Sequence, residues 1–285
     1  MILNRTVAWH DWGISLKADE KHAKRLVEFF ELDVDSRSMI YPGSKEGNAE
    51  DVEDCELTKN ESTVSRGLAA TANYLSADRY DMQFAAKELC RDMAIPKTSS
   101  MRKMKMMARY FLGHPELEIR YENQPPQSTM TVYVDSDWAG CLDTRRSTSG
   151  GVMCLGGHCV KSWASTQAIL AISSGEAEFY ALVEGASRAL GGQSLCRDLG
   201  RDVKIKLFTD SSAAKGIAHR NGIGKMRHLE TKYLWIQDVI KNRELEVCKV
   251  LGTENPGDIG TKHLSVVQMK PLLRKIGLFV KGRAD

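Results

Sequence analysis

The run Val-Tyr-Val-Asp-Ser-Asp-Trp-Ala-Gly at residues 132–140 joins an apolar strand to a pair of acids. Residues 129–135 alternate between polar and apolar side chains, which predicts a half-buried strand that ends at Asp135. Asp137 would point the same way if the strand continued, so the two acids compete for one role. Asp135 could also be only a turn residue at the end of the strand.

Three more acids occupy informative positions downstream. Asp210 ends another apolar run, and Glu178 lies in a helical pattern. Asp258 lies just past the start of a further helix. Acids at the ends of adjacent strands can converge, and several carboxylates at one point bind Mg²⁺ or Mn²⁺ in preference to Zn²⁺. The pattern predicts a metal site, whose ligands would be Asp135, Glu178, Asp210 and Asp258.

Each of these acids also has a structural alternative. Asp210 precedes Ser211-Ser212 and could cap the next helix. Asp258 follows Asn255-Pro256, which resembles an N-cap and a first-turn proline, and an acid there favours the helix dipole. Taken together, acids at the ends of two separated strands and on the intervening helix are harder to explain as caps.

Glu176 and Glu178 lie two residues apart, and only one has an evident structural role. The segment Ser173-Ser174-Gly175-Glu176 fits a capping box, in which Glu176 bonds back to the Ser173 amide. This assignment leaves Glu178 as the metal ligand. The apolar stripe of the helix does not by itself decide between the two.

Composition sets broad limits on the class of protein. The chain has 285 residues and a formal net charge of +3, so nucleic-acid binding would depend on local charge. Its seven cysteines are scattered without a Cys-x-x-Cys pair, which indicates reduced thiols in an intracellular protein. No apolar run is long enough to cross a membrane, and the N-terminus lacks a signal-peptide core. We therefore expect a cytoplasmic or nuclear protein without a membrane partner.

The first half of the chain is expected to be mainly helical. Helical spacing occurs over residues 20–31, 66–92 and 98–113. The acidic, polar stretch 42–66 predicts a solvated loop, and linker composition at 123–128 predicts a domain boundary.

Beyond that boundary, strand and helix patterns follow in a regular order. Two strands over 150–155 and 158–164 are joined by Gly156-Gly157, which is typical of a hairpin. A long helix is predicted over 174–199. A strand, two helices, a strand and a last helix follow at 204–210, 212–219, 226–241, 245–251 and from about Asn255. This order predicts an α/β fold with a mixed sheet flanked by helices.

Several motifs of the second half occur in the order found in the ribonuclease H domain of copia-type retrotransposon Pol polyproteins. They are Asp-Ser-Asp-Trp-Ala-Gly-Cys-Leu-Asp-Thr-Arg-Arg-Ser-Thr-Ser-Gly (135–150), Ser-Ser-Gly-Glu-Ala-Glu-Phe-Tyr-Ala-Leu (173–182), Phe-Thr-Asp-Ser-Ser-Ala-Ala (208–214), Arg-His-Leu-Glu (227–230) and Asp-Ile-Gly-Thr-Lys (258–262). The chain resembles that family, and the resemblance implies a ribonuclease H-like mixed five-stranded sheet flanked by helices.

The upstream half resembles another part of the same polyproteins. Residues 73–85 are similar to the segment after the palm of the reverse transcriptase, and residues 18–23 resemble the region just before it. The resemblance implies a C-terminal part of such a polyprotein. Its expected parts are a truncated reverse transcriptase end with thumb and connection (1–124), a ribonuclease H domain (128–265) and a C-terminal helical tail (266–285). The Tyr-x-Asp-Asp hairpin is absent, so no reverse transcriptase activity is expected.

The resemblance also implies a chemistry for the four acids. They would be catalytic carboxylates that hold two Mg²⁺ ions, or Mn²⁺, and hydrolyse the RNA strand of an RNA–DNA hybrid. Arg145, Arg146 and Ser211 would contact the substrate, although a solvated turn equally explains the two arginines. The expected partners are the hybrid and the upstream reverse transcriptase or integrase regions of a parent polyprotein.

The chain departs from the family pattern at a few positions. Residues 251–255 contain no histidine, where many ribonucleases H have a mobile one before the last acid. Thr261-Lys262-His263-Leu264 replaces the usual Thr-Lys-Pro-Leu, and Ser165-Thr166 replaces lysines. The alternative hypothesis is therefore a catalytically decayed, hybrid-binding or structural remnant of the polyprotein.

Overall fold

The computed structural model describes residues 3–43, 54–224 and 229–282, and it divides the chain into two compact units. The first unit combines residues 1–121 with residues 263–285, and the second unit holds residues 122–262. The chain therefore leaves the first unit close to the predicted linker and returns to it after Lys262. The predicted boundaries of the independently folding domains stay a prediction.

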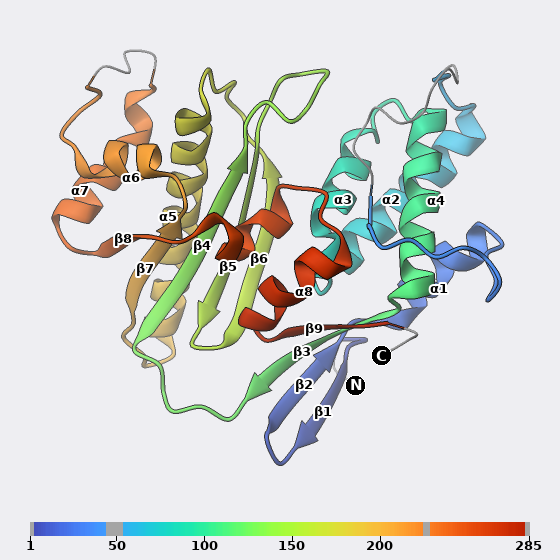
Figure 1. Ribbon diagram of the computed structural model, residues 1–285, viewed down its shortest axis with the longest axis horizontal. Helices are drawn as coiled ribbons and strands as arrows, with labels where there is room; N and C mark the ends of the chain where they lie inside the picture. Colours follow the sequence, from blue (N-terminus) through green and yellow to red (C-terminus); the bar gives the residue numbers. More distant parts are fainter. Residues whose placement is uncertain (1–2, 44–53, 225–228, 283–285) are drawn as a thin grey trace. The chain divides into compact units, whose positions relative to one another are not determined.

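The second unit contains a five-stranded sheet with the strand order β6-β5-β4-β7-β8 (Figure 1). The first three strands form an antiparallel meander, whereas β4 pairs with β7, and β7 with β8, in parallel. The strands are β4 (Thr129–Asp137), β5 (Thr148–Leu155), β6 (His158–Thr166), β7 (Lys204–Thr209) and β8 (Leu245–Lys249). The predicted α/β fold with a mixed five-stranded sheet flanked by helices is confirmed.

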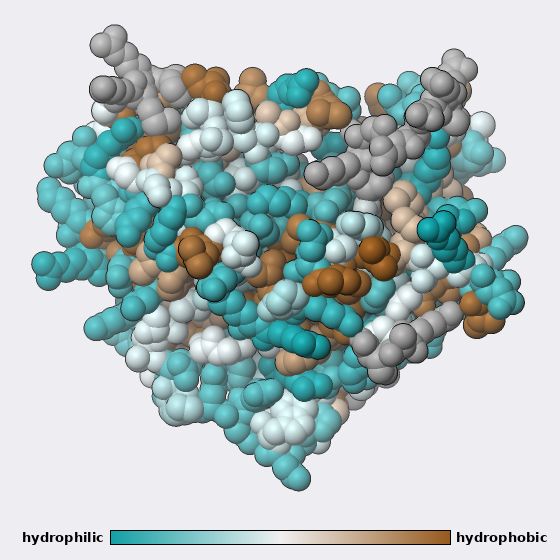
Figure 2. Space-filling model, in the orientation of Figure 1, coloured by the Kyte–Doolittle hydropathy of each residue, from teal (hydrophilic) through white to brown (hydrophobic). Residues whose placement is uncertain are grey.

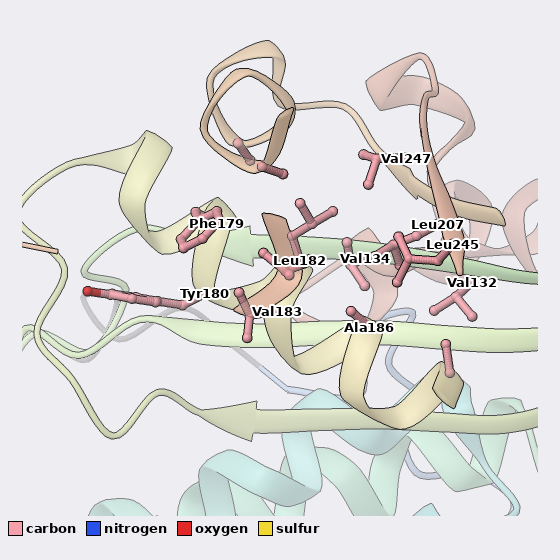
Figure 3. Close-up of a cluster of buried hydrophobic side chains, with 14 of the residues drawn as sticks. Val132, Val134, Phe179, Tyr180, Leu182, Val183, Ala186, Leu207, Leu245 and Val247 are labelled. Carbon is pink, nitrogen blue, oxygen red and sulfur yellow. The ribbon is translucent and has the colours of Figure 1, made fainter. Parts of the chain in front are cut away.

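Helix α5 (Ser174–Asp198) packs along one face of this sheet and supplies much of the core (Figures 1 and 3). Its buried residues Phe179 and Leu182 belong to the same hydrophobic cluster as the strand residues of β4 and β7. Gly185 lets the helix approach closely, since a Cβ there would lie 2.4 Å from Val134 Cγ1. The close approach of α5 to β4 therefore requires glycine at this position.

Two shorter helices, α6 (Ser212–His219) and α7 (Trp235–Lys241), complete the helical layers of the second unit. The predicted helix over 226–241 is shorter in the structure, where a 3₁₀ turn, η1 (Thr231–Tyr233), precedes α7. Residues 225–228 lie outside the described residues. The helix expected from Asn255 is a single 3₁₀ segment, η3 (Pro256–Gly260), which Asn255 caps by accepting a bond from the Gly257 N–H. A further 3₁₀ turn, η2 (Gly252–Glu254), directly precedes it.

The first unit combines helices with a four-stranded sheet in the order β1-β2-β3-β9. The strands are β1 (Thr6–His10), β2 (Gly13–Lys17), β3 (Glu116–Glu122) and β9 (Leu278–Lys281). The helices are α1 (Glu20–Phe29), α2 (Lys59–Ser76), α3 (Tyr80–Arg91), α4 (Thr98–Gly113) and α8 (Val266–Lys275). The expectation of a mainly helical region left this sheet out. The expected C-terminal tail contains β9 as well as α8, because the short strand pairs with a partner far away in sequence.

The predicted helix over 66–92 is two helices, α2 and α3, separated at residues 77–79. Helix α2 begins within the stretch expected as a loop, because Thr58 and Glu61 form a capping box there. The rest of that stretch between residues 44 and 53 lies outside the described residues.

Most of the surface seen in Figure 2 is hydrophilic, with apolar side chains in small separate groups. Scattered apolar residues of this kind are ordinary for a folded protein. Among the described residues, no helix has both the length and the apolar character needed to cross a membrane.

A buried ion pair anchors the first unit where α3 begins. Arg79 is 1% exposed and donates from Nε and Nη2 to the two carboxylate oxygens of Asp81, at 2.9 and 2.7 Å. The Tyr110 hydroxyl donates to the same carboxylate at 2.7 Å. Arg79 also donates to the carbonyls of His114 and Pro115. One charge network thus links the start of α3 to the end of α4.

We expect Asp81→Ala to destabilise the chain by about 3–5 kcal/mol, because it leaves the buried Arg79 charge without its counter-ion. Tyr110→Phe removes one hydrogen bond to the same carboxylate and should cost about 1–3 kcal/mol. Urea unfolding followed by circular dichroism measures both free energies. Equal costs for the two variants would contradict a charge-based role for Asp81.

Candidate metal and catalytic site

Asp135 lies within β4 near the centre of the sheet and is 1% exposed. The alternation predicted a strand that ends at Asp135. The strand instead continues to Asp137, so Asp135 lies inside it. The Thr261 hydroxyl donates to Asp135 Oδ2, and Lys262 Nζ lies 3.4 Å from the same oxygen. The carboxylate is therefore fixed by residues that follow η3.

Asp137 has a separate structural role. Its carboxylate accepts a hydrogen bond from the backbone N–H of Thr148, across the turn between β4 and β5. A Cβ at Gly140 would overlap the Asp137 carboxylate, so the turn packs directly onto it. Asp137 is thus engaged in the turn, whereas Asp135 lies with Glu178 and Asp210, and the role of Asp135 as a metal ligand stays a prediction.

Three of the predicted ligands converge. Asp135, Glu178 and Asp210 each offer a carboxylate oxygen, and these oxygens lie within 4.8 Å of one another. Asp210 directly follows β7, while Ser211 caps α6 by accepting a bond from the Ala214 N–H at 3.1 Å. The cap is therefore Ser211, and Asp210 remains available to the cluster.

Burial and mutual repulsion shape the ionisation of this cluster. Burial, followed by the charges of Asp135 and Asp210, raises the pKa of Glu178 to about 9. Burial and the charge of Asp258 raise the pKa of Asp135 to about 7, against the opposing effects of Lys262 and Thr261. Both acids thus hold a proton more tightly than they would in water.

One atom of the cluster is buried without a partner. Among the described residues, no group donates a hydrogen bond to Glu178 Oε2. A buried carboxylate oxygen is costly unless a donor or a cation satisfies it. Three converging carboxylates with one unsatisfied oxygen fit a hard divalent cation such as Mg²⁺ or Mn²⁺.

Asp258 lies in η3 beside the three-carboxylate cluster and is not one of its members. Its Oδ1 is 2.9 Å from Lys262 Nζ, and its charge acts on Asp135. The structure thus brings Asp258 next to Asp135 through a shared lysine. Its role as a metal ligand stays a prediction.

Glu176 is occupied by local contacts, as the capping assignment required. Its N–H donates to Ser173 Oγ at 3.2 Å, and its carboxylate accepts bonds from the Ile172 N–H at 2.9 Å and the Tyr180 hydroxyl at 2.6 Å. The carboxylate therefore reaches one residue beyond the expected Ser173 amide. Glu176 is 2% exposed, so it is a more deeply buried structural residue than a simple cap.

The three residues predicted to contact the substrate lie in two places, an exposed turn and the N-terminus of α6. Arg145 and Arg146 are exposed in the turn between β4 and β5, where Arg145 has a φ of 54°. The side chain of Ser211 is engaged as the cap of α6. Contacts of these three residues with a substrate stay predictions.

Comparison with known proteins shows that the chain is similar to part of several transposon polyproteins. No family model matches it. It is 29% identical over 220 residues, 76% of its length, to the retrovirus-related Pol polyprotein from transposon RE2 of Arabidopsis thaliana. It is 25% identical over 186 residues, 65% of its length, to that from transposon TNT 1-94 of Nicotiana tabacum. The chain is a homologue of the copia-type retrotransposon Pol polyproteins.

The predicted family resemblance is therefore confirmed, for part of a Pol polyprotein only. The matched region spans 15% of the RE2 polyprotein and 14% of the TNT 1-94 polyprotein. Among solved structures, the chain is similar to LC11-RNase H1, isolated from compost, at 16% identity and a TM-score of 0.38. That match covers 47% of this chain and 94% of LC11-RNase H1. A second structure, of LC11-RNase H1 in complex with an RNA/DNA hybrid, matches with a TM-score of 0.34.

Sequence reasoning did not assign a role to Lys262 in this Pol homologue. Lys262 lies four residues after Asp258, and its ammonium contacts both Asp258 and Asp135. An acid followed by a lysine four residues later is a frequent ion-pair spacing in helical turns. That spacing was the available signal, but the contact with Asp135 depends on the fold.

The stability of the metal-free chain should fall as the pH rises through the range of these shifted acids. In an unfolded chain Asp135 and Glu178 would ionise near pH 4, whereas their folded pKa values are about 7 and 9. Their contribution to stability is thus complete below about pH 4 and is lost as the pH rises through the folded values. Thermal melts in chelator over this pH range measure the loss.

The control for this prediction is Glu178→Gln, which keeps the shape of a neutral glutamic acid. Its melting temperature should decline less than that of the unchanged chain between about pH 5 and 9, because the variant has no proton to lose there. Parallel pH profiles for the two proteins would show that Glu178 ionises at an ordinary pKa.

Proposed function

We propose that this Pol homologue is a metal-dependent ribonuclease H that hydrolyses the RNA strand of RNA–DNA hybrids. The observation that supports this most is the convergence of three carboxylates, one of which, that of Glu178, has a buried oxygen without a hydrogen-bond partner. A structural protein gains nothing from such a cluster, since the acids repel one another. A bound cation would relieve this repulsion, and a phosphate of the substrate could then join the cation.

Asp135, Glu178 and Asp210 would hold the first divalent ion, and Asp258 would help to hold a second. Divalent ions, when bound, supply Lewis acidity at the scissile phosphate and its leaving oxygen. The raised pKa values of Asp135 and Glu178 mean that both acids must give up their protons before they can serve as ligands. Mg²⁺ is the expected ion, and Mn²⁺ is the expected substitute.

The chain's own residues keep this site in place. Asn255 Nδ2 donates to the Val134 carbonyl at 2.9 Å, which ties the start of η3 to the strand beside Asp135. The Thr261 hydroxyl holds the Asp135 carboxylate from the other end of η3. Asp258 lies between these two attachments but outside the three-carboxylate cluster, so we expect it to be the most dispensable of the four acids.

Substrate recognition would use groups that distinguish RNA from DNA. The 2′-hydroxyls of the RNA strand are the chemical feature that separates the strands of a hybrid. Arg145 and Arg146 are exposed in the turn after β4 and would contact phosphates, with Ser211 beside Asp210 as a further contact. The upstream reverse transcriptase and integrase regions of a parent polyprotein are the proposed protein partners.

One observation favours the alternative of a non-catalytic, hybrid-binding or structural remnant. Lys262 already places a positive charge against Asp135 and Asp258, at 3.4 and 2.9 Å. In the remnant hypothesis this lysine would replace the metal permanently. The two functions differ in whether the chain cleaves a hybrid.

The purified chain should cleave the RNA strand of a labelled RNA–DNA hybrid in Mg²⁺ or Mn²⁺ and spare duplex DNA. Two metal ions at the carboxylates are the physical basis, so excess chelator should stop cleavage. Gel analysis of both labelled strands measures the outcome. Cleavage that survives the chelator, or none with either ion, would reject the proposal.

Glu178→Gln should abolish this cleavage, because it removes a carboxylate from the centre of the cluster, and should leave folding intact. Glu176→Gln should instead cost about 1–3 kcal/mol of stability, because it weakens buried hydrogen bonds to Ile172 and Tyr180, and should retain cleavage. Cleavage rates and thermal melts of both variants separate the two roles. The opposite pattern would assign the ligand role to Glu176.

A further inference from the structure

Lys262 occupies a defined position in the carboxylate site rather than an arbitrary place on the surface. Its Nζ lies 2.9 Å from Asp258 Oδ1 and 3.4 Å from Asp135 Oδ2. The Asp135 side chain is 2% exposed, whereas the Lys262 side chain is 42% exposed. The lysine thus reaches from solvent onto a buried acid.

The backbone after η3 fixes this position. The N–H groups of Thr261 and Lys262 donate to the Asp258 carbonyl at 3.2 and 3.1 Å, which closes a tight turn. That turn directs two successive side chains at the same atom, Asp135 Oδ2, since Thr261 donates its hydroxyl to it and Lys262 presents its ammonium. A lysine held by its own turn against two acids is a built-in counter-ion.

A divalent ion and this ammonium cannot use the same oxygens together. Mg²⁺ binds carboxylate oxygens at about 2.0–2.1 Å, and an ammonium within hydrogen-bond range of the same oxygens would be close enough to repel it strongly. Lys262 contacts Asp135 and Asp258 directly, whereas its charge acts on Glu178 without a direct contact. A cation that enters between Asp135 and Asp258 therefore meets the ammonium group of Lys262 at close range.

We propose that Lys262 is the resident counter-ion of this site, which holds Asp135 and Asp258 together in the metal-free chain and competes with the divalent ion for that pair. The inference rests on the proposed function, since it assumes that the carboxylates bind metal. Lys262 is thus a positioning residue. It keeps the acids assembled before the metal arrives, and it weakens the binding of metal between Asp135 and Asp258.

A thermal-shift titration of the full chain with MnCl₂, without substrate, tests this competition. The informative variants are Lys262→Met and Lys262→Gln, which remove the charge, and Lys262→Arg, which keeps it. Lys232→Met is the matched control. Lys232 belongs to the same unit, and its Nζ lies 2.7 Å from Glu230 Oε2, in an ion pair that includes none of the clustered acids.

Without metal, the uncharged Lys262 variants should melt at a lower temperature than the unchanged chain, because their acids repel one another unopposed. In Mn²⁺ their half-maximal stabilisation should occur at a concentration lower by about threefold or more, since the competitor is gone. Lys262→Arg and Lys232→Met should respond like the unchanged chain.

The outcomes separate this inference from the proposed function. An equal or weaker Mn²⁺ response in both uncharged variants would overturn the competition and leave the metal site intact. Stabilisation by Mn²⁺ in the uncharged variants alone would support the inference and show that Lys262 blocks the site. Failure of Mn²⁺ to stabilise any of the proteins would reject the metal site, and with it the competition.

Discussion

Repulsion among carboxylates in a partly buried site is the constraint on which the second unit depends. Asp135, Glu178 and Asp210 come from a central strand, a helix and a neighbouring strand, and their oxygens still converge. Burial, and after it the like charges of the neighbouring acids, raises the pKa values of Asp135 and Glu178. The surrounding structure must therefore hold the acids together against their own charge.

Close packing of η3 against the sheet provides that restraint. A Cβ at Gly257 would lie 2.9 Å from the Asp135 backbone nitrogen, and a Cβ at Gly150 would lie 2.8 Å from the Gly257 carbonyl oxygen. Glycine at both positions allows η3 to lie directly on β4 and β5. This close contact brings Thr261 and Lys262 to Asp135. Glycine at positions 150 and 257 is therefore as necessary to the site as the acids themselves.

The sequence could predict the elements of the second unit because its strands alternate and its long helix has a cap. The strand ranges, the hairpin at Gly156-Gly157 and helix α5 follow the predicted order closely. The four-stranded sheet of the first unit was not predicted, because β9 is short and its partner β3 is far away in the chain. Likewise, periodicity located Asp258 near a helix start, but only the fold shows that Lys262 links it to Asp135.

The energetics of the site bear on the choice between an enzyme and a remnant. In the metal-free chain the ionisation of Asp135 or Glu178 opposes folding, so replacement of Glu178 by a neutral residue would relieve the folded state. A protein that used this unit only as a scaffold would be more stable without the cluster, because strained or repulsive groups lower stability unless a ligand uses them. Here the converging acids and the unsatisfied oxygen of Glu178 occur together. That combination is the expected state of a site whose repulsion is relieved by a bound cation, and it supports the enzyme over the scaffold.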